Sequence, residues 1–314
     1  MAYHGPPLPI DHLGDSMRRD QPPFLLANQR RDHATAWASR TPDQTVTVVG
    51  DFDTALTEVG LHGRWDPGLK ASTAQVLRTC LVGQPAGIIA DLHDLSDPGG
   101  ASAPLWCAAR TWGAHTPPPV PVVVCLPTAA PLASILTCQA ARWNLPVYAS
   151  LPEARAALKG HTIRADRLTL HLEPDIEVLA LVGQTIGDAC AAWQLLPLHR
   201  TASAVLTELV ANAIEHAGTR IDVAVTRRPD GLHLAVHDRD SRPPHLPRTV
   251  PGDPGDPARH GYGLRLVHTS ATAWGALPTR TGKIVWAVLA AGKATDRIPR
   301  QPSTVRGTTG PRRR

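Results

Sequence analysis

The order of the expected secondary structure changes halfway along the chain, and this change limits the fold more than any other feature. Between residues 45 and 159, apolar strand patterns alternate with helical patterns. That alternation predicts an α/β layer with a mainly parallel or mixed sheet. From about residue 173 two helical segments come first, and strands follow. This second order predicts an α+β two-layer sandwich, with helices on one face of a mostly antiparallel sheet.

These patterns place two folded domains at residues 45–160 and 173–291, joined by a connector at about 161–172. Residues 1–43 are rich in proline and charge and show no sustained period, so we expect a disordered leader. The formal net charge of the chain is +5, and residues 292–314, with seven lysines and arginines and one aspartate, carry +6 of it, so the rest is close to neutral at −1. We expect a disordered basic tail there and no specific nucleic-acid site.

Cysteine usage and hydropathy indicate the class of protein. The five cysteines are scattered, with no C-x-x-C pair and no common zinc spacing, which favours reduced thiols. No stretch reaches the roughly 18 apolar residues of a membrane span, and no signal peptide pattern begins the chain. We therefore expect a cytoplasmic protein that does not enter a membrane.

The stretch "ELVANAIEHAG" at residues 208–218 is a helix pattern with an unusual polar side. Helical spacing puts an apolar stripe on one side and four polar residues on the other. The apolar residues are Val205, Leu206, Leu209, Val210, Ala213, Ile214 and Ala217, and the polar residues are Glu208, Asn212, Glu215 and His216. Periodicity alone leaves two interpretations open, a solvated helix face or a ligand site.

Residues further along the chain favour the ligand site. Asp238 ends a strand pattern, a proline-rich loop of roughly twenty residues follows, and Gly261-x-Gly263 then begins a helix. Asn212 is a neutral oxygen ligand suited to Mg²⁺, and a buried carboxylate such as Asp238 can accept a hydrogen bond from the adenine amine. Glycines at a helix start let backbone N–H groups approach phosphate oxygens. Glu208, one turn before Asn212, can act as a general base.

Residues from about 175 to 290 resemble the ATP-binding domain of the GHKL superfamily, and most closely the anti-sigma-factor serine kinases. "TELVANAIEHAG" resembles the N box, "VHDRDSRPP" and "HGYGLRLV" resemble the two glycine boxes, and "TRTGKIVWAVL" resembles the closing strands. The resemblance implies ATP and Mg²⁺ as cofactors and a GHKL (Bergerat) fold. It also implies Asn212 as the metal ligand, Glu208 as the catalytic base, Asp238 on adenine, and Gly261 and Gly263 on phosphate.

The chain departs from the pattern of that superfamily at two places. The first glycine box usually reads Asp-x-Gly-x-Gly. Here Asp240 and Arg242 stand at the two glycine positions after Asp238. Ile284 replaces a frequent threonine after Gly-Lys, and we expect Lys283 to be an exposed strand residue. We interpret His216 as a packing residue, or as a residue that supports those touching the ligand, and not as a phosphate acceptor.

The first domain resembles a STAS domain, the fold of anti-sigma-factor antagonists, over residues 54–159; an unrelated α/β domain is the alternative. The STAS acceptor motif is Asp-Ser-Ser/Thr-Gly, and this chain reads Asp97-Pro98-Gly99-Gly100, so the acceptor hydroxyl is missing. Ser96 and Ser102 lie nearby, and we interpret Ser102 as a helix N-cap. We expect this domain to act as a permanent binding surface that occupies or regulates the kinase face.

Together these features predict an ATP-binding regulator of partner-switching type, acting in transcriptional or stress regulation. It would phosphorylate a serine or threonine of a separate protein, and its expected partners are a sigma factor, a STAS-domain anti-sigma antagonist, or both. The alternative is a non-catalytic, ATP-gated interaction scaffold with a STAS-like docking domain. Retention of Glu208 favours the serine/threonine kinase, and the glycine-free first box favours the scaffold. Homodimerisation stays an open alternative.

Overall fold

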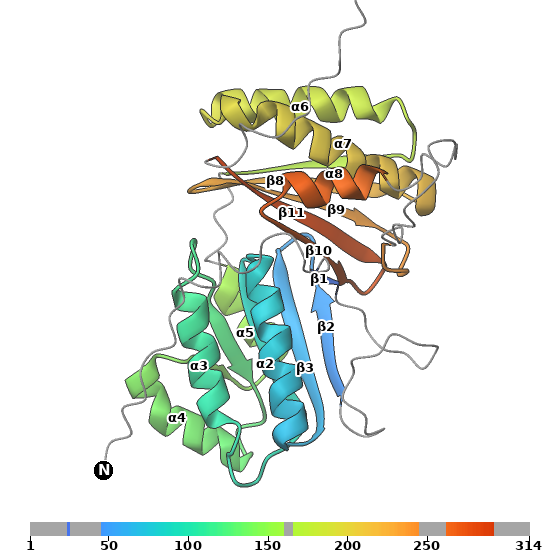
Figure 1. The fold of residues 1–314 in the computed structure, drawn as a ribbon. Coiled ribbons are helices and arrows are strands. Elements are labelled where there is room, and N and C mark those ends of the chain that lie inside the picture. The colour runs from blue at the N-terminus through green and yellow to red at the C-terminus, as the bar shows by residue number, and fades with distance from the viewer. Residues whose placement is uncertain (1–23, 26–44, 160–165, 245–261, 292–314) are drawn as a thin grey trace, which may run out of the picture.

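The computed structural model describes residues 24–25, 45–159, 166–244 and 262–291, which form two domains stacked on each other (Figure 1). Within the expected disordered leader, Phe24–Leu25 forms the short strand β1. The rest of that leader, the loop at 245–261 with Gly261, and the expected basic tail at 292–314 lie outside the described residues.

The first domain is an α/β layer on a five-stranded mixed sheet, as the alternating pattern predicts. The strand order is β2-β3-β4-β5-β6, in which β2 and β3 are antiparallel and all other neighbours are parallel. The strands are β2 (Thr45–Gly50), β3 (Leu56–Arg64), β4 (Gly87–Ser96), β5 (Val122–Cys125) and β6 (Val147–Tyr148). The helices are α2 (Pro67–Val82), α3 (Ala103–Ala114), α4 (Pro131–Trp143) and α5 (Leu151–Lys159).

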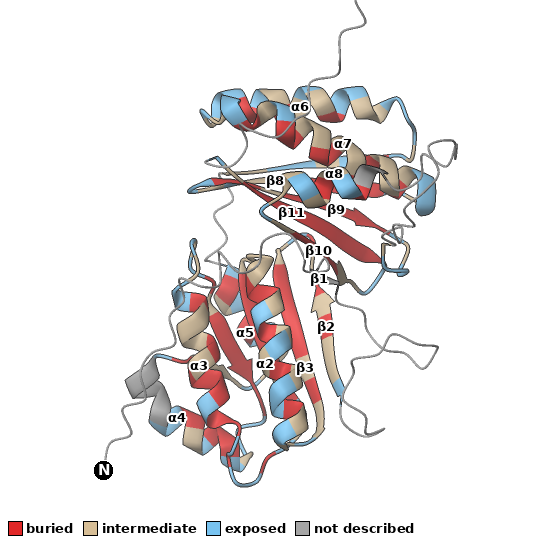
Figure 2. Ribbon diagram, viewed as in Figure 1, coloured by how far each residue is buried: buried red, intermediate tan, exposed pale blue. Residues whose placement is uncertain are grey.

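Helices cover both faces of this first sheet. Leu77, Trp106 and Leu136, from α2, α3 and α4, share one buried core with one face of the sheet. Leu158 of α5 packs with Ile89 on the other face. The central strands are therefore buried on both sides, which explains their nearly continuous apolar sequence (Figure 2).

The second domain is a two-layer α+β sandwich, as expected. Its six-stranded sheet has the order β1-β10-β11-β9-β8-β7, and every pair is antiparallel except β1 with β10. The strands are β7 (Arg167–Leu172), β8 (Ile221–Arg228), β9 (Gly231–Asp238), β10 (Ala273–Pro278) and β11 (Lys283–Ala290). The helices are α6 (Val178–Ala192), the 3-10 turn η2 (Leu196–Leu198), α7 (His199–His216) and α8 (Tyr262–Ser270), and they share one core with the inner face of the sheet.

Strand β7 corrects the expectation of a plain connector at residues 161–172. It pairs antiparallel with β8 at the sheet edge, with Arg167 opposite Thr226. Leu168, Leu170 and Leu172 alternate along it, but Leu168 remains 40% exposed. A short edge strand that is only partly covered gives a weak apolar pattern, which is why the sequence did not separate it from a connector.

The outer face of the second sheet, turned away from its helices, is also apolar and is covered by the first domain (Figures 1 and 2). Ala235, Ile284 and Trp286 lie on this outer face, in one buried cluster with Phe52 from the β2–β3 loop. Strand β11 is buried at seven consecutive positions. An antiparallel strand open to water on one side would alternate, so this burial requires a cover on both faces.

Polar contacts join the same two surfaces. Arg167 donates a hydrogen bond to the Phe52 carbonyl, and its guanidinium lies 5.3 Å from the centre of the Phe52 ring. Arg280, in the β10–β11 turn, donates to Glu58 Oε2 at 2.8 Å. These contacts orient the first domain on the sheet while Phe52 supplies apolar burial.

Within the described ranges, none of the helices combines the length and the apolar character that crossing a membrane requires.

Replacing Phe52 with alanine should weaken this docking. Because a buried phenyl ring would leave a cavity, we expect the free energy of unfolding in urea to fall by about 3 kcal/mol. Hydrogen exchange should also accelerate in β9 and β11. The matched control is Leu181→Ala on α6, whose side chain is 48% exposed, and it should cost less than about 0.5 kcal/mol. Equal losses in the two variants would contradict the interdomain contact.

Candidate functional site

Helix α7 places the polar set found in the sequence. Val205, Leu206, Leu209, Val210 and Ala213 are buried in the core, which confirms the predicted apolar stripe. Glu208 and Asn212 are half-buried on the other side, one turn apart, so both side chains can reach one ligand. His216 is exposed at the helix end, so the prediction that it packs is wrong.

The environment of Glu208 suits a general base. Burial raises the pKa of its carboxyl above that of a solvated glutamate, because desolvation disfavours the charged form. Among the described residues, neither Glu208 nor Asn212 has a recorded side-chain hydrogen bond. Both groups are therefore available to a ligand at this face.

Asp238 ends β9 and is 2% exposed, but Lys283 already occupies part of its carboxylate. Lys283 Nζ donates to Asp238 Oδ1 at 2.9 Å and to the Asp240 carbonyl at 3.0 Å. The expectation that Lys283 is exposed is wrong, because it begins β11 directly opposite Asp238 and is only 7% exposed. Its ammonium supplies a counter-charge to a buried carboxylate.

The glycine-free box after Asp238 is held by hydrogen bonds among its own residues. The Asp240 backbone N–H donates to Asp238 Oδ1 at 2.9 Å, and Arg242 Nε donates to Asp240 Oδ2 at 3.0 Å. Desolvation opposes ionisation of Asp240, but the hydrogen bonds from Arg242 outweigh it and lower the pKa of the Asp240 carboxyl. Both recorded bonds to the Asp238 carboxylate end on Oδ1, so within the described residues Oδ2 remains for a ligand.

The ends of α7 and β9 meet beside this box. Arg239 N–H donates to Thr219 Oγ1 at 3.0 Å, and Arg242 donates to the His216 carbonyl at 3.4 Å. Gly282 also lies against the box, since a Cβ added there would fall 1.9 Å from the Asp238 carbonyl oxygen. The close approach at Gly282 explains why the sequence has glycine immediately before Lys283.

Helix α8 packs beside α7 and begins at Tyr262. Gly263 lies in its first turn, where backbone N–H groups lack intrahelical acceptors, as the phosphate role requires. Gly261 lies outside the described residues. The box after Asp238 thus lies at the C-terminal end of α7, the helix that carries Glu208 and Asn212, and α8 packs beside the same helix.

His237 connects this site with the interdomain surface. It precedes Asp238 and points to the outer face, where its ring stacks on Phe52 with 5.5 Å between ring centres. Its Nδ1 lies 3.3 Å from Asp222 Oδ2, and its Nε2 lies 3.1 Å from Thr279 Oγ1. Burial lowers the pKa of the His237 imidazole. The adjacent β9 residues His237 and Asp238 therefore point to opposite faces of the sheet.

The first-domain loop that lacks the acceptor hydroxyl is held by Asp97. Its two carboxylate oxygens accept from the backbone N–H groups of Ala101 and Ser102, at 2.9 and 2.8 Å. Ser102 is the N-cap residue of α3, as expected, but its side chain makes no capping hydrogen bond. Its buried Oγ accepts instead from Trp106 Nε1 at 3.0 Å, and Asp97 holds the two residues just before the helix. Pro98 is exposed.

A cluster of Asp91, His93 and Cys125 was missed in the sequence because its members lie on two strands. Their ligand atoms lie within 4.8 Å of one another. His93 Nδ1 is 2.6 Å from Asp91 Oδ1 and Nε2 is 3.2 Å from the Ala149 carbonyl, so both nitrogens face acceptors. Desolvation and the nearby Asp91 charge raise the pKa of Cys125 to about 11, which keeps the thiol protonated at neutral pH. The contacts fit a charged imidazole better than a metal site.

Comparisons with known proteins agree with the fold of the second domain. A family model described as the histidine kinase-like ATPase domain matches residues 173–289. An anti-sigma factor antagonist from Mycobacterium paratuberculosis is a similar solved structure, with 16% identity and a TM-score of 0.32, over 38% of this chain and 97% of the antagonist. No curated protein matches the sequence. The match to this family model coincides with the two-layer α+β sandwich of the second domain.

Proposed function

We propose that this protein is an ATP-dependent regulator whose second domain binds Mg-ATP and phosphorylates a hydroxyl group of a separate protein. The observation that carries the proposal is the pair on α7, a half-buried Glu208 with a raised pKa one turn before Asn212. A histidine kinase-like ATPase domain supplies the expectation of ATP. The residues of this chain fit that ligand.

Each residue has a role in this proposal. Asn212 would hold Mg²⁺ through its amide oxygen, and Asp238 Oδ2 would accept from the adenine amine. The backbone at Gly261 and Gly263 would bind phosphate oxygens. Bound ATP would supply the phosphoryl group. Glu208 would accept the proton of the attacking hydroxyl, a role that a raised pKa favours because it strengthens the base.

A non-catalytic scaffold is the second candidate, and the Lys283–Asp238 ion pair favours it. Asp238 is shared with an ammonium at 2.9 Å, and a ligand amine would have to bind beside that positive charge. The side chains of Asp240 and Arg242 also stand where the superfamily has glycines. In the scaffold, ATP would bind and order the site without phosphoryl transfer.

The partner class follows from the first domain, which we propose is STAS-like. A separate STAS-domain antagonist or a sigma factor is the proposed partner, in a cytoplasmic system of partner switching. The first domain contacts the outer face of the sheet, whereas Glu208 and Asn212 lie on the opposite side. The described part of the first domain, residues 45–159, therefore lies on the side away from the nucleotide face, where we propose that such a partner binds.

Mg-ATP should raise the melting temperature of the full chain. Ligand at about 100 times Kd adds about 2.7 kcal/mol to the free energy of unfolding when only the folded state binds. Asn212→Ala and Asp238→Ala should each abolish the shift measured with and without nucleotide. Asp230→Ala, at the other end of β9, should retain it. No shift for the unmodified chain at millimolar Mg-ATP would refute nucleotide binding.

Glu208→Gln should separate the two candidates. If Glu208 is the base, the variant should keep its Mg-ATP thermal shift and lose phosphoryl transfer by about 100-fold or more, measured with labelled ATP and serine-bearing antagonists. Glu215→Gln, on the exposed end of α7, is the control. Transfer by the unmodified chain should fall with acidification at a higher pH than an ordinary glutamate would give. Undiminished transfer in Glu208→Gln would exclude the base role.

The first domain should not be phosphorylated by its own chain. Pro98 offers no hydroxyl, and the loop that holds it lies at the far end of β4 from the second domain. The ten residues of β4 rise about 3.3 Å each, so the ends are roughly 30 Å apart. Mass spectrometry after incubation with Mg-ATP should find residues 45–159 unmodified. Stoichiometric phosphate on Ser96 or Ser102 would disprove this.

A further inference from the structure

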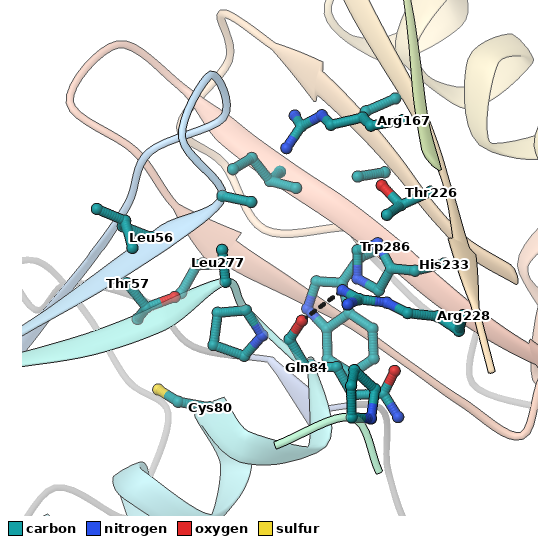
Figure 3. A pocket seen from close by; sticks show the side chains of 18 of the residues that line it. Leu56, Thr57, Cys80, Gln84, Arg167, Thr226, Arg228, His233, Leu277 and Trp286 are labelled. Carbon is teal, nitrogen blue, oxygen red and sulfur yellow. Dashed lines mark hydrogen bonds between the residues drawn. The ribbon is translucent and has the colours of Figure 1, made fainter. Parts of the chain in front are cut away.

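A cavity of about 560 Å³ lies between the two domains, on the outer side of the second sheet and away from α7. The first domain contributes Leu56, Cys80 and Gln84 to its lining, and the second contributes Arg167, Arg228 and Trp286 (Figure 3). Small-molecule sites in proteins commonly measure about 300–1,000 Å³. The volume is therefore that of a ligand site and exceeds a packing defect.

Two arginines without carboxylate partners face this cavity. Arg167 lies opposite Thr226 on neighbouring strands, and Arg228 is two residues further along β8, so both arginines lie on the outer face. Among the described residues, no carboxylate is within 4.0 Å of either guanidinium, and the buried Nε atom of each has no hydrogen-bond partner. Among the described residues, each arginine donates only through its Nη2 atom. Arg167 donates to the Phe52 carbonyl, and Arg228 donates to the Gln84 carbonyl.

These guanidinium groups are poorly compensated. Desolvation lowers the pKa of both, although the charges of Asp53 and Asp51 partly offset it at Arg167. Desolvation and the neighbouring charge of Arg167 bring the pKa of Arg228 down to about 10. Of the acids at the rim, Asp166 lies 4.0 Å from Arg227, and Asp51 accepts from the Thr54 N–H. Partly buried positive charge is costly without a counter-charge. An anion entering the cavity would meet the side chains of both arginines, which line it.

The other residues that line the cavity indicate what kind of molecule it could bind. Phe52, Leu277, Ile284 and Trp286 provide flat and branched apolar surface. Desolvation and the nearby arginines lower the pKa of His233 to about 3, so its imidazole is neutral and adds no further charge. The Oε1 atom of Gln84 is buried without a partner and can accept one hydrogen bond.

We propose that this cavity binds a small organic anion, a single anionic head group carried on a flat apolar body. Arg167 and Arg228 bind the head, and Trp286 with its apolar neighbours packs on the body. A purely structural role, in which the arginines only brace the two domains, would not account for a cavity of about 560 Å³ lined by both arginines. The site is separate from the nucleotide face, and its test uses no nucleotide.

Calorimetric titration of the full chain with four matched probes tests the proposal. The probes are 1-naphthoate, 1-naphthyl phosphate, neutral 1-naphthamide and inorganic phosphate. At least one naphthyl anion should bind, and the tighter of the two identifies a carboxylate or a phosphate head. Naphthamide and inorganic phosphate should each bind about tenfold or more weakly, since each lacks one half of the ligand. Naphthamide binding as tightly as both anions, or no saturation by either anion at millimolar concentration, overturns the proposal.

Variants locate the binding. Arg167→Gln and Arg228→Gln should each weaken the naphthyl anion about tenfold or more. Arg280→Gln is the matched control, because it removes an interdomain ion pair with Glu58 and does not line the cavity. Thr226→Trp, which fills the cavity while keeping both arginines, should also abolish binding if the arginine variants fail to fold. Unchanged affinity in the arginine variants or in Thr226→Trp assigns the arginines a bracing role and refutes the site.

Discussion

The second sheet is apolar on both faces, and the arrangement of the whole molecule depends on covering both. Helices α6, α7 and α8 cover the inner face, and the first domain covers the outer face through Phe52. Burying apolar area contributes about 25 cal/mol per Å², so an uncovered outer face would be both costly and prone to association. The two domains therefore form one packed structure, in which the first domain lies against the outer face of the second sheet.

Side chains along β9 and β11 point alternately to the inner and the outer face of that sheet. Asp238 and Lys283 point to the inner side, where they pair, whereas His237 and Ile284 point to the outer side and pack near Phe52. A substitution on one face therefore changes a residue whose chain neighbours point to the other face. Because the proposed nucleotide site and the interdomain cavity share these strands, ligands at the two sites would contact the same rigid element from opposite sides.

The Lys283–Asp238 pair bears on the proposed chemistry. Removing one partner of a buried ion pair costs about 3–5 kcal/mol, so the apo protein depends on Lys283. The pair also reduces the negative charge that Asp238 offers to a ligand amine. Glu208 has no such partner among the described residues, and burial raises its pKa. The proposed base is therefore better preserved than the proposed adenine contact, which is why phosphoryl transfer and nucleotide affinity need separate tests.

The sequence by itself determined the order of elements, both fold classes, and the two sides of α7. Those features follow from local periodicity, because helix spacing alone places Glu208 and Asn212 opposite the stripe of Leu209 and Ala213. The pattern could not reveal β7, whose Leu168 remains 40% exposed at a sheet edge.

Only the tertiary structure decided what lies across from each polar residue. Lys283 is buried because pairing of β9 and β11 puts it opposite Asp238, and the buried Ser102 hydroxyl accepts a hydrogen bond from Trp106. Arg167 and Arg228 face a cavity because the first domain docks on their side of the sheet. Such contacts join residues far apart in the chain, and local patterns of hydrophobicity carry no information about which distant surfaces will meet.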